Sequence, residues 1–198
     1  MDVGTAVTAA WSSGISMYGV AALLGIASRV GWIDGLDVLG RTWVIALMLA
    51  LFVVELIADK VPYVDSAWDA VHTVIRPVAG GYVMTLANGS SFSVPALAAS
   101  GAVLAFSSHS AKASTRLVVN ASPEPVSNIV VSAAEDGLVG VLMALALAYP
   151  ALALVITLVL AVVSIVVAVV LFRTARRIAR RLRAARRSGL PPSELPPP

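Results

Sequence analysis

The chain has 198 residues, of which 59% are hydrophobic and only 13% are charged, and its mean hydropathy is +0.90. A soluble domain of this length carries about twice that charged fraction. The composition therefore leaves too little polar surface for a water-soluble globule and favours one compact domain in a bilayer. The absence of cysteine excludes disulfides, thiolate nucleophiles and thiolate metal sites.

Hydrophobic segments recur along the chain and predict an all-α, polytopic membrane helix bundle of about six hydrophobic helices. The first segment covers residues 5–27 and is rich in small residues, which let helices approach closely in lipid. A polar turn follows over residues 29–41. The second segment covers residues 42–59 and ends before Pro62, because proline cannot continue the helical hydrogen-bond ladder.

The third and fourth segments, residues 66–87 and 94–113, are less hydrophobic and carry basic or histidine residues near one end. They either cross the membrane fully or form a re-entrant hairpin lined by protein. The fifth segment covers residues 129–149. The sixth, residues 151–172, has no charged residue and is the strongest predicted span. Residues 1–172 are thus predicted to form the membrane domain.

The C-terminal region is strongly basic. Eight of the fourteen lysines and arginines lie between Arg173 and Arg187, and residues 173–188 are predicted to form a basic helix that binds anionic lipid headgroups. Topology and lipid explain this charge without nucleic acid. Residues 189–198 are rich in proline and are predicted to be disordered. Because basic residues concentrate on the cytoplasmic side, an even number of spans would place both termini in the cytoplasm.

Ionisable residues of the predicted membrane domain gather at one depth, in its cytoplasmic half, where charges are costly and usually face a partner or water. The residues of this candidate polar cleft are Glu55, Asp59, Asp69, His72, Arg76, His109, Lys112, Arg116, Glu135 and Asp136. Two trios, 69/72/76 and 109/112/116, have the offsets i, i+3 and i+7, so each lines one face of a helix. Because the two helices are antiparallel, these faces are expected to meet.

Less specific interpretations compete with a binding site. Ser66 and Asp69 match a capping box, with Ser66 as N-cap. Lys112 and Arg116 could instead extend to lipid headgroups. No metal-ligand spacing and no signature of a common catalytic site occurs, so no metal is expected, an enzyme is not expected and the cofactor stays unknown.

Several motifs carry a family resemblance. They are the runs 55–77, 109–116 and 120–128, together with Glu135-Asp136. These motifs resemble an uncharacterised bacterial membrane family, the domain of unknown function numbered 4126, and the resemblance covers most of residues 5–172. It implies a multi-pass protein of the bacterial inner (plasma) membrane. The resemblance implies no activity.

Three functional hypotheses follow from the polar cleft. The first is a transporter or channel-like protein that binds an ion or small charged solute in a cleft facing the cytoplasm. The second is a non-catalytic accessory subunit that packs against a membrane protein partner or another copy of itself, with the charges forming internal bridges. The third is a lipid-binding protein in which His72, Arg76, Lys112 and Arg116 hold a lipid phosphate.

Overall fold

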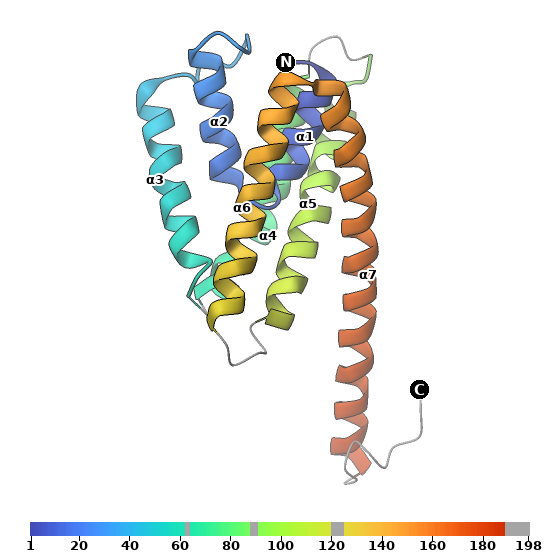
Figure 1. The fold of residues 1–198 in the computed structure, drawn as a ribbon. Coiled ribbons are helices and arrows are strands. Elements are labelled where there is room, and N and C mark those ends of the chain that lie inside the picture. Colours follow the sequence, from blue (N-terminus) through green and yellow to red (C-terminus); the bar gives the residue numbers. More distant parts are fainter. Residues whose placement is uncertain (62–63, 88–90, 120–124, 189–198) are drawn as a thin grey trace.

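The computed structural model describes residues 1–61, 64–87, 91–119 and 125–188. Within these ranges the chain forms seven α-helices and no strand, which confirms the predicted all-α class (Figure 1). The helices are α1 (Val3–Ser13), α2 (Met17–Arg29), α3 (Thr42–Ala58), α4 (Val64–Thr85), α5 (Val94–Val119), α6 (Pro125–Ala148) and α7 (Pro150–Ser188).

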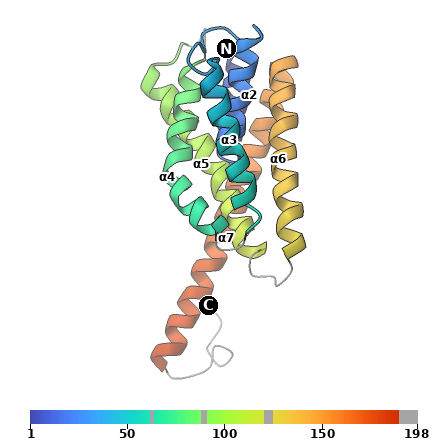
Figure 2. The same ribbon diagram turned by 90° about the vertical axis from the view of Figure 1, so that its left-hand side faces the viewer.

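The first hydrophobic segment is two helices, and the prediction of one continuous span over residues 5–27 is wrong. α1 ends at Ser13, the chain turns through residues 14–16, and α2 returns to the end of the bundle where α1 began (Figures 1 and 2). α1 has 11 residues and therefore rises about 16 Å, at 1.5 Å per residue. The tip of this α1–α2 hairpin thus lies near the middle of the bundle.

Helix α1 occupies the centre of the bundle and contacts α2, α4, α5, α6 and α7. Its residues from Gly4 to Ser13 are all buried, and most are small. A side chain at Gly4 would collide with the carbonyl group of Pro150 at the start of α7. The Thr5 hydroxyl lies 2.9 Å from the Ala146 carbonyl oxygen, and the Thr8 and Thr157 hydroxyls are 3.0 Å apart. Small side chains and hydroxyls thus allow a mostly apolar helix to pack among five others.

Helices α4 and α5 pack against each other along most of their length and run antiparallel (Figure 2). Both are continuous helices, of 22 and 26 residues, and the choice between two full spans and a re-entrant hairpin over residues 66–113 stays a prediction. Close approach depends on Gly80 and Gly101, because a Cβ on either would meet the backbone of the other. α4 remains helical through Pro77, which brings the residues on both sides of this proline onto one continuous helix.

Within the described part of the chain, two helical stretches are long and apolar enough to cross a membrane by length and composition, residues 129–148 in α6 and 150–174 in α7. α2 and α3 are apolar but shorter. α7 extends well beyond the other helices (Figure 1). The predicted basic helix over residues 173–188 is part of α7, whereas the predicted disordered tail at 189–198 lies outside the described residues.

Met1 and the far end of α7 lie at opposite ends of the bundle (Figure 1). The turn at residues 14–16 causes this arrangement, because it returns the chain to its starting end. The predicted even number of crossings, with both termini in the cytoplasm, stays a prediction. Only the five helices from α3 to α7 then pass from one end of the bundle to the other.

Candidate functional site

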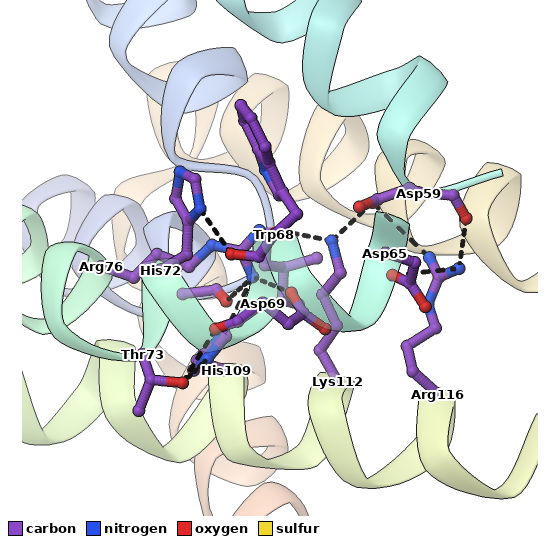
Figure 3. Close-up of polar contacts among 12 residues, drawn as sticks. Asp59, Asp65, Trp68, Asp69, His72, Thr73, Arg76, His109, Lys112 and Arg116 are labelled. Atoms are coloured by element: carbon purple, nitrogen blue, oxygen red, sulfur yellow. Dashed lines mark hydrogen bonds and ion pairs between the residues drawn. The ribbon is translucent and has the colours of Figure 1, made fainter. Parts of the chain in front are cut away.

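A network of buried charged side chains lies directly beyond the tip of the α1–α2 hairpin. It is formed by the C-terminal end of α3, the first half of α4, the second half of α5 and one residue of α6 (Figure 3). The charged members of this ion-pair network are Glu55, Asp59, Asp65, Asp69, Arg76, Lys112, Arg116 and Glu135. All but Glu135 are at most 5% exposed. The network therefore links helices α3, α4, α5 and α6 to the break in the first hydrophobic segment, between α1 and α2.

Arg76 joins the hairpin tip to the rest of the network. Its Nη1 donates to the Gly14 carbonyl oxygen at 3.1 Å and contacts His109 Nδ1 at 2.9 Å. Its Nη2 donates to Glu55 Oε1 at 2.8 Å, and the other Glu55 oxygen accepts a hydrogen bond from the Ser16 hydroxyl at 2.9 Å. Arg76 thus binds the end of α1, while Glu55 binds the start of α2.

Lys112 makes a second attachment to the hairpin tip. Its Nζ donates to the Ile15 carbonyl oxygen at 3.1 Å and to Asp59 Oδ2 at 2.6 Å. Arg116, one helical turn further along α5, donates to the Asp59 carbonyl oxygen at 2.8 Å and to Glu135 Oε2 at 2.6 Å. Lys112 and Arg76 are therefore the two cations at the C-terminal end of α1, where the helix dipole and free carbonyl groups are negative.

The hydrogen bonds of His109 fix its protonation state. An arginine nitrogen can only donate, so His109 Nδ1 must accept from Arg76 and carries no hydrogen. The Thr73 hydroxyl donates to the Asp69 carbonyl oxygen at 2.8 Å, so it accepts from His109 Nε2 at 3.0 Å. His109 is therefore a neutral imidazole in this arrangement, and we assign the tautomer from these partners.

His72 lies in an aromatic group next to the ion pairs. Its Nδ1 donates to the Trp68 carbonyl oxygen at 2.8 Å, and its Nε2 is 3.1 Å from the Tyr18 hydroxyl of α2. The Trp68 ring stacks on the imidazole, with ring centroids 4.6 Å apart. These contacts connect α4 to α2 and make His72 a neighbour of the network rather than a member.

A model of DUF4126, a domain of unknown function, matches residues 3–170, which is most of the chain. The chain belongs to the DUF4126 family. No curated protein and no solved structure matches it. The match ends inside α7, so the hairpin, the network and all helices that build it belong to the DUF4126 domain.

The DUF4126 fold brings the two predicted trios together. The faces of α4 and α5 meet as predicted, with Arg76 contacting His109 across the interface. Glu55 pairs with Arg76 and Glu135 with Arg116, but Asp136 forms no ion pair with any other described residue. The structure thus assembles most of the candidate residues, and Asp136 lies at the margin.

Two of the competing interpretations are wrong. α4 already begins at Val64, so Ser66 lies inside the helix, and the Asp69 carboxylate faces Arg76 rather than a helix terminus. Lys112 and Arg116 do not extend to the surface, because both are buried and paired with carboxylates.

The prediction of an open cleft is also wrong. Among the described residues of the network, Arg76, Arg116 and Glu55 are at most 1% exposed, and only the Glu135 side chain, at 16%, has substantial contact with solvent. The cause is direct pairing between side chains from neighbouring helices, which fills the space that the charges were expected to line. No group of three histidine or acidic side chains in the described ranges is placed to hold a metal ion.

Sequence reasoning omitted two parts of the DUF4126 site. Asp65 belongs to the network, with its carboxylate 4.0 Å from Arg116, and its position four residues before Asp69 was a usable signal because it extends the same helix face. The hairpin tip at Gly14, Ile15 and Ser16 had no comparable signal. Its contacts come from side chains far along the chain.

Proposed function

We propose that this chain is an integral membrane protein in which α3 to α7 cross the bilayer and the α1–α2 hairpin enters from one side and turns back within it. The proposal is supported by the distribution of polarity, since the charged network is buried and the outer surface is apolar. Exposed apolar residues of the five long helices include Val54, Val78, Val103, Val141 and Val162. Apolar surface on this scale is unfavourable in water and suits contact with lipid chains.

The orientation follows from the basic end of α7. Arginine and lysine are enriched on the cytoplasmic side of membrane proteins, and eight arginines lie at residues 173–187. We therefore assign the far end of α7 and the turn between α3 and α4 to the cytoplasm. Met1 and the loop between α2 and α3 then lie on the opposite side, after five crossings.

We propose that the protein transports a small ion, and that the buried network is its binding region in a closed state. The observation that carries this proposal is the break in the first hydrophobic segment, which lies against the network. Helices interrupted inside a membrane are typical of transporter binding sites, because their free backbone groups and end dipoles bind ions. Here the free carbonyl groups of Gly14 and Ile15 accept from Arg76 and Lys112. Release of these contacts would open the network to one side.

The test is ion flux through purified protein reconstituted in liposomes that contain a dye sensitive to protons, sodium or potassium, with the gradient of the matching ion applied in each case. Glu55→Gln removes the charge that Arg76 binds but keeps an acceptor for Ser16. We expect the wild type to conduct ions. The flux rate of Glu55→Gln should be about tenfold lower, equivalent to ~1.4 kcal/mol. Asp37→Asn, on the exposed loop between α2 and α3, is the matched control and should conduct normally. Absence of flux in the wild type under every gradient would refute the proposal.

A non-catalytic accessory subunit is the second candidate, and one observation favours it. The network side chains are paired directly with one another and closed to solvent, as expected for internal bridges. In that case Glu135→Gln should lower stability, and any cellular phenotype should follow the amount of protein. If the network binds an ion, the same variant should lose function while still accumulating. Native purification with mass spectrometry would identify bound partners.

Lipid binding is less favoured by the geometry. The basic groups proposed to hold a lipid phosphate, Arg76, Lys112 and Arg116, are buried inside the bundle, and each is already paired with a carboxylate. A phosphate would have to displace these carboxylates from an environment that carries an excess of negative charge.

A further inference from the structure

The ion-pair network contains more acid than base. Its carboxyl groups are Glu55, Asp59, Asp65, Asp69 and Glu135, and its bases are Arg76, Lys112 and Arg116, so five carboxylates face three cations and the difference is two negative charges. His109 adds no charge, because its Nδ1 accepts from Arg76. Even a charged His72 would leave one negative charge in excess. Uncompensated charge in a buried site is strongly unfavourable, so the site favours binding of protons or other cations.

Of the carboxyl groups Glu55, Asp59, Asp69 and Glu135, Asp69 lies farthest from its nearest cation. Glu55, Asp59 and Glu135 each accept from a cation at 2.6 to 2.8 Å. The Asp69 Oδ1 atom is 3.4 Å from Arg76 Nη1, and its Oδ2 atom is buried and accepts no hydrogen bond within the described part of the chain. Since the side chain is 7% exposed, water offers little compensation.

The positive and negative charges that surround Asp69 already cancel one another, before the charge of Asp69 itself is counted. The groups that face it are Asp65 and Arg76 on α4, Lys112 on α5 and Asp59 at the end of α3. α1 carries no charged side chain, and α2, which contacts His72 of α4 through the Tyr18 hydroxyl, has its charged residue, Arg29, at its far end. Two cations and two carboxylates therefore surround Asp69, and ionising it adds negative charge that no neighbour offsets.

We infer that Asp69 binds a proton, and that its charge controls how firmly Arg76 holds the hairpin tip. This inference rests on the proposed function, since it names the ion. Arg76 Nη1 carries two hydrogens but has three acceptors within reach, the Gly14 carbonyl oxygen, His109 Nδ1 and Asp69 Oδ1. A carboxylate is a stronger acceptor than a carbonyl group. Ionised Asp69 therefore competes with Gly14 for Arg76.

Protonation ends that competition. A proton from the aqueous phase adds to a carboxylate oxygen of Asp69 and gives the neutral acid, with no other bond broken and no change of oxidation state. Arg76 then donates to Gly14 and His109 without a third strong acceptor, and the hairpin tip is held in place. Loss of the proton draws Arg76 towards Asp69 and weakens the contact that closes the network against α1. Proton binding and movement of the hairpin are coupled through one side chain.

Infrared difference spectroscopy in detergent tests the proton directly. Spectra recorded at acidic and alkaline pH should differ by the carbonyl stretch of a protonated carboxylic acid. That band should be lost in Asp69→Asn and kept in Asp37→Asn. Asp69→Glu keeps a titratable group and should shift the band, which provides a second variant if Asp69→Asn does not fold. A band unchanged in both Asp69 variants, or one that responds to sodium or potassium rather than to pH, would overturn the inference.

Hydrogen exchange at the hairpin tip tests the coupling in the wild-type protein. The amides of Gly14, Ile15 and Ser16 donate to Trp11 and Ser12 carbonyl groups, so their exchange reports opening of the turn. After correction for the intrinsic pH dependence of exchange, their protection should fall about tenfold as Asp69 ionises, equivalent to about 1.4 kcal/mol. Asp69→Asn should remove this dependence. Protection that stays constant while the infrared band titrates would refute the coupling.

The two proposals fail separately. If the Asp69 band titrates but no gradient drives flux, then transport is refuted and the proton site remains. If flux occurs but Asp69→Asn changes neither the spectrum nor the rate, then the proton site is refuted and transport remains.

Discussion

Replacing Arg76 with methionine should destabilise the protein more than any other single change in the ion-pair network. The Arg76 side chain is fully buried, and it binds Glu55 at 2.8 Å, His109 at 2.9 Å and the Gly14 carbonyl oxygen at 3.1 Å. Methionine matches its length but offers no donor. The change leaves the Glu55 carboxylate buried without its cation, and it leaves the hairpin tip without one of its two cationic attachments.

These contacts set the expected loss in the free energy of unfolding. Removing one partner of a buried ion pair lowers the free energy of unfolding by about 3–5 kcal/mol. Loss of the hydrogen bond from Arg76 to the Gly14 carbonyl oxygen lowers the free energy of unfolding by about 1 kcal/mol more. For a chain of this size, 1 kcal/mol corresponds to about 2–4 °C in Tm, so Arg76→Met should lower Tm by about 10 °C or more.

Thermal unfolding in detergent, followed by circular dichroism, measures this loss. Arg41→Met, at the exposed start of α3, is the matched control and should change Tm by only a degree or two. Adding Glu55→Gln to Arg76→Met should restore about 1–3 kcal/mol, because the second change removes the unpaired charge. If Arg76→Met is as stable as the control, or if the double variant has the same Tm as Arg76→Met, then the contacts of Arg76 do not stabilise the fold.

Three further predictions concern the hairpin and the two ends of the chain. Gly14→Ala should lower Tm by several degrees, because the new Cβ would collide with α5 at the Ala105 carbonyl group; unchanged Tm would show that the hairpin can shift away from α5. Partial burial raises the pKa of Asp2, but hydrogen bonds from the Thr5 side chain and backbone outweigh it and lower the pKa below its usual value of 3.8. Asp2 therefore stabilises the fold above pH 3.8, and pH-dependent unfolding should show this contribution fade as the pH falls through the lowered pKa, except in Asp2→Asn. Glutamine in place of the arginines at 173–187 should weaken binding to anionic liposomes in a flotation assay, as should added salt, and binding that ignores both would refute a lipid-binding role for this segment.

The sequence by itself determined which residues meet between α4 and α5. Spacing of i, i+3 and i+7 places each trio on one face of its helix whatever the surroundings, since helical geometry is local. Two antiparallel helices joined by a short turn pack side by side, so Arg76 and His109 come into contact. The strong hydrophobicity of residues 151–172 likewise identifies α7, because it depends on composition alone.

Tertiary structure decided where the first hydrophobic segment breaks. Residues 5–27 contain no proline, and Ser12-Ser13-Gly14 is a weak stop signal, so local propensity permits one continuous helix. Breaking the helix frees backbone carbonyl groups that must find donors in a buried site. Arg76 and Lys112 supply those donors from positions more than sixty and more than ninety residues away. No local pattern encodes such partners, and the same long-range contacts turn the expected open cleft into a network of buried, directly paired charges. They also stabilise the turn that leaves Met1 and the far end of α7 at opposite ends of the bundle.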